Sequence, residues 1–194
     1  MIEQITMKWT LLALLALITF SPLASEFVFD FSPVKNKFDD TLKLAEQGDA
    51  NSQFNLGYMY RKGEGVIQSN KQAIEWYTKS AVQGYAVAQL MLGLLYDEGK
   101  GVTKDYKRAV KWYTKAAMNG EANAQYSLAV MHDNGRGVIQ SDKKAYIWWS
   151  IAVANGNHFA IKGRDRMAEK LSQKTLEEAQ EEAAKLYGKI DGTK

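Results

Sequence analysis

The sequence predicts an all-α fold, an α/α solenoid (superhelix) of 36-residue helix-turn-helix repeats that ends in a C-terminal capping helix. Four glycines, Gly48, Gly84, Gly120 and Gly156, are spaced 36 residues apart. Three tryptophans, at 76, 112 and 148, keep the same step. Between the glycines, apolar residues recur at helical spacing. Because one two-helix unit cannot bury its own apolar face, successive units must stack to complete a core.

Residues 1–25 are predicted to be a secretory signal peptide. Lys8 precedes an uncharged apolar run of 12 residues at 9–20, and small residues follow at 21–25. A membrane-spanning helix needs about 20 apolar residues, so an uncleaved anchor is the weaker alternative. The segment therefore predicts an exported protein, periplasmic in the first place or else secreted, with no stable membrane span after cleavage.

Two details of this leader stay open. Cleavage after Ala24 and cleavage after Ser25 both fit the pattern of small residues. Translation can start at Met1 or at Met7, and Met7 gives the better basic start because it removes Glu3.

Residues 26–37 form an N-terminal arm, and residues 38–47 align with the second helix of a partial repeat. The segment 27–31 of the arm carries phenylalanine at three alternate positions. We expect it to pack over the first repeat as a cap, and the alternative is an arm that engages a partner.

Three full repeats follow at 48–83, 84–119 and 120–155. The first helix of a repeat runs from about Asp49 to Lys62 and ends at a glycine, and the second begins after an N-cap residue at the position of Ser69. Gly57 lies in the middle of the first helix, where glycine costs about 1 kcal/mol relative to alanine. Its presence predicts that a partner helix crosses closely there. The three periodic tryptophans are predicted to lie in the core.

Residues 156–188 are expected to form a partial repeat and the capping helix. Ala160 still fits the repeat, and a charged run at 162–170 reads as a solvated helix face. Thr175 and Glu178 are predicted to form a capping box at the start of the last helix. One apolar face on that helix, at Leu176, Ala179, Ala183 and Leu186, would cover the end of the stack.

These residues resemble the Sel-one-like repeats, which are relatives of the tetratricopeptide repeats. The matching positions are Ala50, Gln53, Leu56, Gly57, Tyr60, Gly63, Gly65 and Val66, followed by Ala73, Trp76, Tyr77, Ala81 and Gly84. The third repeat departs from the pattern at Ala129, His132, Trp149 and Val153. The resemblance covers about residues 38–188, and it implies an adaptor that assembles protein complexes.

Composition argues against most other classes of function. The chain has no cysteine and only two histidines, so we expect no metal, no cofactor and no thiol chemistry. A net charge of +3 without a basic stripe argues against nucleic acid as a partner. His132 takes the position of Tyr60 and Tyr96 and is expected to pack rather than to act as a base. We expect no catalytic residue and no enzyme activity.

Positions that vary among the three repeats are free for recognition, and those on the first helix recur at i, i+4 and i+7. Within a repeat stack that face should line the concave surface, where a peptide or helix can dock. The predicted partner-binding residues are Asn51, Asn55, Tyr58, Val87, Met91, Leu94, Asn123, Ser127 and Val130.

The leading hypothesis is a non-catalytic scaffold of the cell envelope, a monomer that binds another protein or peptide on this face. An immunity or inhibitor protein for an exported toxic effector is the alternative. A remote alternative is binding or hydrolysis of β-lactams, which the resemblance attaches to a cysteine-rich branch of the family whose cysteines this chain lacks.

Overall fold

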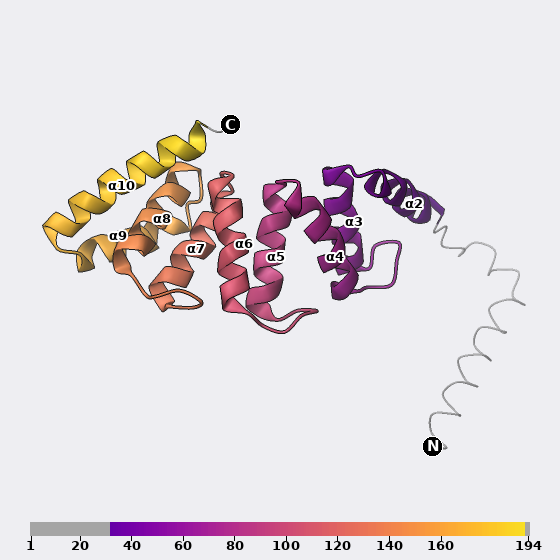
Figure 1. Cartoon of the computed structure of the whole chain (residues 1–194), viewed down its shortest axis with the longest axis horizontal. Helices are drawn as coiled ribbons and strands as arrows, with labels where there is room; N and C mark the ends of the chain where they lie inside the picture. The colour runs from indigo at the N-terminus through magenta and orange to yellow at the C-terminus, as the bar shows by residue number, and fades with distance from the viewer. Residues whose placement is uncertain (1–31, 193–194) are drawn as a thin grey trace, which may run out of the picture.

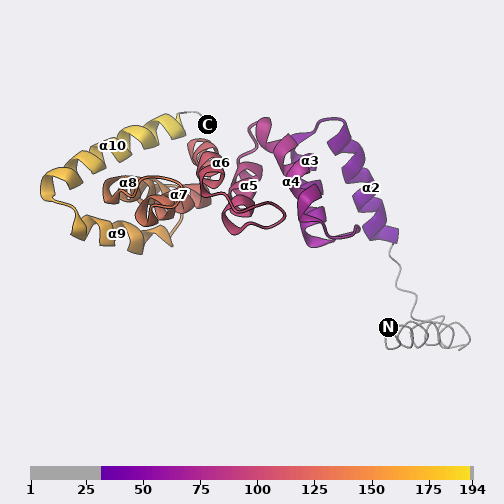
Figure 2. The ribbon, with the colours of Figure 1, turned by 60° about the horizontal axis from the view of Figure 1, so that its bottom comes forward.

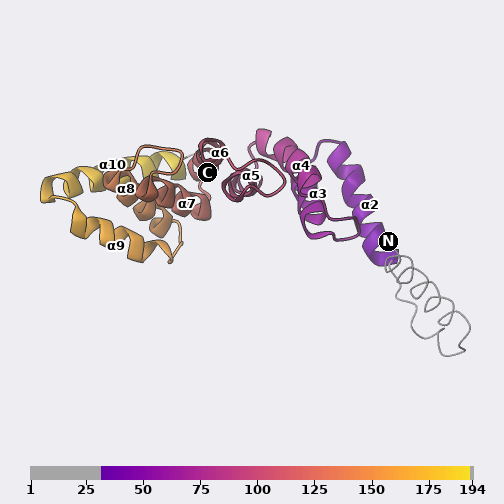
Figure 3. The same ribbon diagram turned by 90° about the horizontal axis from the view of Figure 1, so that it is seen from below.

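The computed structural model describes residues 32–192, and within that range the fold is all-α (Figure 1). The helices are α2 (Ser32–Glu46), α3 (Ala50–Lys62), α4 (Asn70–Val82), α5 (Ala86–Glu98), α6 (Tyr106–Met118), α7 (Ala122–Asn134), α8 (Asp142–Ala154), α9 (Ala160–Lys170) and α10 (Gln173–Asp191). Successive helices pack on each other, and α10 returns to pack on α8. The views in Figures 2 and 3 show them following one another along the long axis, which confirms the predicted solenoid.

Helix boundaries follow the capping residues that the sequence supplies. Asp49 caps α3 by accepting a hydrogen bond from the Ser52 amide at 2.7 Å, which lowers the pKa of the Asp49 carboxyl. Gly63 ends the helix with a φ of 76°, a left-handed conformation that favours glycine. Ser69 caps α4 in turn, and Asp105 and Ser141 cap α6 and α8 in the same way.

The mid-helix glycines mark close helix crossings, as predicted. A Cβ atom on Gly57 would lie 2.7 Å from the ring of Tyr77, and one on Gly93 would lie 2.4 Å from the ring of Tyr113. Both tyrosines are buried. In the first two repeats the helix pair therefore closes around an aromatic ring because the facing residue has no side chain, and in the third the small Ala129 takes this position.

The prediction that all three periodic tryptophans are core residues was wrong for two of them. Trp148 is buried, but Trp76 and Trp112 are half-buried, with the ammonium groups of Lys79 and Lys115 3.6 Å and 4.6 Å from the ring centroids. Adjacent helical residues point about 100° apart, so on a helix with one covered face only one of two neighbouring aromatics packs fully into the core, whereas on α8 both Trp148 and Trp149 are buried. In α4 and α6 the following tyrosine takes that place.

A buried glutamine joins three helices at each junction between repeats. Gln53 donates from Nε2 to the Ala45 carbonyl at the end of α2 at 3.1 Å. Its Oε1 accepts from Gln83 at the end of α4 at 2.8 Å. Gln89 and Gln125 make the corresponding bonds one and two repeats later. Leaving a buried amide unpaired is costly, and in all three repeats these bonds pair the side chain of this recurring glutamine.

The two ends differ from the expectation in detail. Helix α2 begins at Ser32, within the segment 26–37 expected as an arm, whereas the phenylalanine segment 27–31 lies outside the described residues. The capping box prediction was wrong, because Ser172 is the N-cap of α10 and accepts from the Thr175 amide at 3.3 Å. Glu178 instead pairs with Lys143 on α8 at 3.3 Å, and so reinforces the packing of the last helix.

Candidate functional site

All nine predicted binding residues lie at the surface, on the first helices of the three repeats. Asn51, Asn55 and Asn123 are exposed, and the other six are half-buried. Two of the asparagines already bond to the following repeat. Asn51 Oδ1 accepts from the Tyr85 hydroxyl at 3.2 Å, and Asn123 Oδ1 accepts from Asn157 Nδ2 at 3.1 Å. Partner binding by the nine residues stays a prediction.

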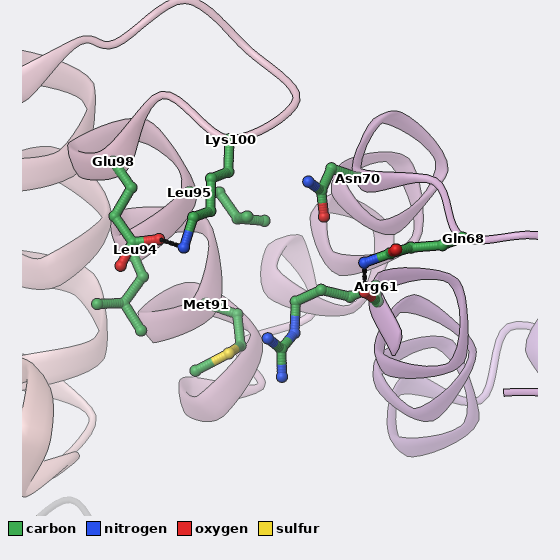
Figure 4. Close-up of a pocket in the computed structure, with 8 residues that line it drawn as sticks. All are labelled: Arg61, Gln68, Asn70, Met91, Leu94, Leu95, Glu98 and Lys100. Carbon is green, nitrogen blue, oxygen red and sulfur yellow. Dashed lines mark hydrogen bonds and ion pairs between the residues drawn. The ribbon is translucent and has the colours of Figure 1, made fainter. Parts of the chain in front are cut away.

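The structure brings Met91 and Leu94 together in a groove of about 470 Å³ between the first and second repeats (Figure 4). We call it the N-terminal groove, and its lining residues are Arg61, Gln68, Asn70, Met91, Leu94, Leu95, Glu98 and Lys100. The apolar residues come from α5, and a polar wall comes from the end of α3, the loop after it and the start of α4. The groove thus has an apolar side and a hydrogen-bonding side.

Arg61 is the main charged group on the polar wall. Its side chain extends toward Met91 in Figure 4, and its Nε is buried without a hydrogen-bond partner in the described part of the chain. The guanidinium carbon lies 5.2 Å from the ring centroid of Tyr58, and Lys62 Nζ lies 5.9 Å from the same ring. Burial raises the pKa of the Tyr77 hydroxyl, and Arg61 beside it opposes that rise.

The backbone that carries Arg61 is held from two directions. Gln68 Nε2 donates to the Arg61 carbonyl at 2.9 Å, and the Ser69 amide donates to the Tyr60 carbonyl at 2.8 Å. Across the groove, Lys100 Nζ pairs with Glu98 at 2.8 Å. The lysine is thereby neutralised within its own loop, while Arg61 faces the groove as a cation.

A second groove of about 420 Å³, which overlaps the first at the repeat positions of Arg61, Met91 and Leu94, lies two repeats further along, between the third repeat and α9. We call it the C-terminal groove, and its lining residues are Tyr126, Val130, Asp133, Trp149, Phe159, Lys162, Gly163 and Arg166. Asp133 takes the position of Arg61, and Arg166 takes that of Leu94. These two residues form an ion pair, and the Arg166 guanidinium carbon lies 5.6 Å from the Trp149 ring centroid. Val130, a predicted binding residue, belongs to this second groove.

The junction between the second and third repeats is arranged differently. Tyr106 replaces Asn70, and its ring centroid lies 5.7 Å from the guanidinium carbon of Arg136. Asp97 replaces Arg61 and accepts a hydrogen bond from the buried Tyr113 hydroxyl at 3.5 Å, and the pKa of that hydroxyl is raised, mainly by burial. The Arg61 position therefore carries a cation in the first repeat and a carboxylate in the next two.

Sequence reasoning missed Arg61, Gln68 and Asn70 as site residues. The prediction considered one face of the first helix, whereas the groove also needs the end of that helix and the start of the second. Variation among the repeats could have found all three, since the positions of Arg61, Gln68 and Asn70 each hold a different residue in at least one other copy.

Other chemistry has little support in the described residues. His132 is buried, and its burial lowers the pKa of the imidazole. No group of three or more histidine, cysteine, aspartate or glutamate side chains in residues 32–192 is placed to hold a metal ion. Among the same residues, no helix combines the length and the apolar character needed to cross a bilayer.

The model of the Sel1 repeat matches three consecutive segments of the chain, at residues 50–85, 86–121 and 122–157. The chain belongs to the Sel1 repeat family. Sel1 repeat proteins generally serve as scaffolds for protein interaction, and their solenoid is generally non-catalytic. None of the curated proteins matches the chain.

Solved structures of other Sel1-like repeat proteins are similar. One is c5321, a protective antigen of uropathogenic Escherichia coli with an SLR fold, at 35% identity and a TM-score of 0.71 over 77% of this chain. The match covers 32% of c5321, so this chain corresponds to about a third of that protein. A Sel1 repeat protein from Oxalobacter formigenes has 35% identity and a TM-score of 0.63, covering 67% of this chain and 98% of its own.

A more distant match is the cysteine-rich protein B of Helicobacter pylori. It is 21% identical, with a TM-score of 0.53, and the match covers 68% of this chain and 98% of that protein. At this level of identity the likeness concerns the fold.

Proposed function

We propose that this chain is a non-catalytic scaffold that binds a protein or peptide segment along its first-helix face, with the N-terminal groove as the main contact. The observation that carries the proposal is the groove itself, where Met91 and Leu94 lie opposite the polar wall formed by Arg61, Gln68 and Asn70. An apolar surface beside polar and charged side chains suits a peptide better than a small apolar ligand.

The distribution of constant and variable positions supports the same function. Leu56 and Gln53 recur in all three repeats, are buried and hold the fold. Residues that change between repeats line the grooves, where substitution alters what can bind without altering the stack. A recognition scaffold requires this combination, a core that is constant among the repeats and grooves that vary.

We further propose that the protein acts in the cell envelope. The support is the leader pattern of residues 1–25, in which Lys8 precedes the apolar run. A fusion of this leader to a reporter that is active only after export would test the location, and a reporter that stayed inside the cell would contradict it.

Site-specific crosslinking in cells of the producing organism tests the binding face. A photoreactive amino acid placed at Tyr58 or Leu94 should give discrete crosslinked products with a partner protein. Exposed positions on the second helices, Glu75 and Lys111, are the matched controls and should give none. Crosslinks confined to those controls would place binding on the opposite face and contradict the proposal.

A further inference from the structure

The two grooves share the repeat positions of Arg61, Met91 and Leu94 but differ in how the guanidinium is paired. In the C-terminal groove the carboxylate of Asp133 and the guanidinium of Arg166 neutralise each other, and Lys162 is a further cation of its lining. In the N-terminal groove no carboxylate within residues 32–192 forms an ion pair with Arg61. The guanidinium of the N-terminal groove is thus unpaired, whereas that of the C-terminal groove is neutralised.

We propose that the N-terminal groove binds an acidic peptide segment, in which a carboxylate side chain pairs with Arg61 and a nearby long apolar side chain packs on Met91 and Leu94. This inference rests on the proposed function and specifies the chemistry of its partner. The occupant is a peptide, because Arg61 and the apolar residues Met91 and Leu94 belong to successive repeats, so a ligand must span both to contact them.

Several features fix where the carboxylate would lie. The end of α3 is held by the bond from Gln68 to the Arg61 carbonyl, so the guanidinium starts from a fixed backbone. One edge of the guanidinium, at Nε, is buried, which leaves its terminal nitrogens to donate toward the groove. A guanidinium with fixed orientation favours paired hydrogen bonds to a carboxylate over contact with a neutral amide.

The surrounding charge favours an anion as well. Lys62 lies beside Tyr58 at the same end of α3, so two cations flank that ring. Lys100 on the other wall is paired with Glu98, and this pair is exposed. Whether the ion pair is formed or broken, the two residues add no net charge to the groove. The wall formed by α3 therefore carries a net positive charge that a peptide carboxylate complements.

A random peptide library displayed on phage, selected on the purified protein, provides the probe. Selected peptides should contain aspartate or glutamate within a few residues of leucine, isoleucine, methionine or an aromatic residue. For a synthetic peptide of the selected sequence, Arg61→Asp should lower the affinity at least about tenfold, as expected for loss of a charge-assisted hydrogen bond. Replacing the acidic residues of the peptide by their amides should give a similar loss.

Combining both changes should cost little more than either alone, because each removes the same pair. Lys111→Asp, an equal change of charge on the exposed face of α6, is the matched control and should leave the affinity within about twofold. Circular dichroism of each variant should show unchanged helicity, which separates loss of binding from loss of fold.

The possible failures are distinguishable. If Leu94→Ser abolishes binding while Arg61→Asp and the amide peptide bind normally, the groove binds peptides without acidic preference. The inference is then overturned and the proposed function stands. If selected peptides bind equally well to the Leu94→Ser and Arg61→Asp variants, binding lies elsewhere, and both the inference and the proposed face are wrong.

Discussion

The N-terminal and C-terminal grooves overlap at the repeat positions of Arg61, Met91 and Leu94, yet these positions are filled in complementary ways. In the first, Tyr77 belongs to the buried cluster on which Met91 packs, and the long side chain of Met91 lines the groove. In the second, the larger ring of Trp149 takes the position of Tyr77, and Gly163 takes the position of Met91. A Cβ atom on Gly163 would lie 2.4 Å from the indole.

This exchange shows how a repeat protein can change a binding surface without changing its backbone. Where the core residue is larger, as Trp149 is, the residue on the facing helix is smaller, as Gly163 is. The packing therefore stays dense in both places. Charge follows the same principle, since Arg61 gives way to Asp133 where Arg166 replaces an apolar residue. The two grooves are therefore lined by different side chains on the same arrangement of helices.

The largest loss of stability should come from placing methionine, which lines the N-terminal groove, at the matching position of the C-terminal groove. Gly163→Met places a long side chain against the Trp149 indole, and overpacking of this kind costs typically 1–3 kcal/mol. Adding Trp149→Tyr recreates the pair found in the first groove and should recover most of the lost stability. Thermal unfolding of the four members of this double-mutant cycle measures the coupling.

Gly188→Ala is the control for that cycle. Gly188 lies within α10 with nothing within 4 Å of an added Cβ atom, so alanine should stabilise the helix by about 0.5–1 kcal/mol. A Gly163→Met variant as stable as the parent protein would show that the two grooves do not differ in volume as described.

The next largest effect concerns the charges of the two grooves and their affinity for acidic peptides. Asp133→Asn removes the carboxylate that neutralises Arg166, so the C-terminal groove should acquire an affinity for acidic peptides. Titration calorimetry with the selected peptide should then show a second binding site, with an affinity at least about tenfold above that of the parent groove. An unchanged stoichiometry would mean that an unpaired guanidinium alone is not enough to bind an acidic peptide.

A smaller effect concerns pH. His132 stands where the first two repeats have Tyr60 and Tyr96, and burial lowers the pKa of its imidazole below the usual 6.5. The unfolded chain then binds a proton more readily than the folded chain, so the stability of the C-terminal half should fall as the pH drops below about 6.5. His132→Tyr should flatten this decline in denaturant titrations between about pH 7 and pH 5. A parallel decline in both proteins would contradict the assignment.

The fold could be predicted from the sequence because its determinants recur locally. Caps such as Asp49 and Ser69, and the small residue at Gly57, act within one helix pair and repeat at a fixed interval. The grooves could not be predicted in the same way, because Arg61 and Met91 meet only across a junction between repeats. The assignment of Trp112 to the core failed for a related reason, since its neighbour Tyr113 faces Gly93 on the opposite helix.

The buried core is divided in two, and this division bears on how the molecule opens. A small cluster that includes Tyr77, Leu92 and Leu95 lies around α4 and α5, and a much larger one extends from Leu90 on α5 to α10. Free energies of local opening follow the amount of buried apolar surface, so we expect the N-terminal end to exchange its amide hydrogens first. The groove with the unpaired cation is therefore built on the more compliant half, where a bound peptide would gain most by holding two repeats together.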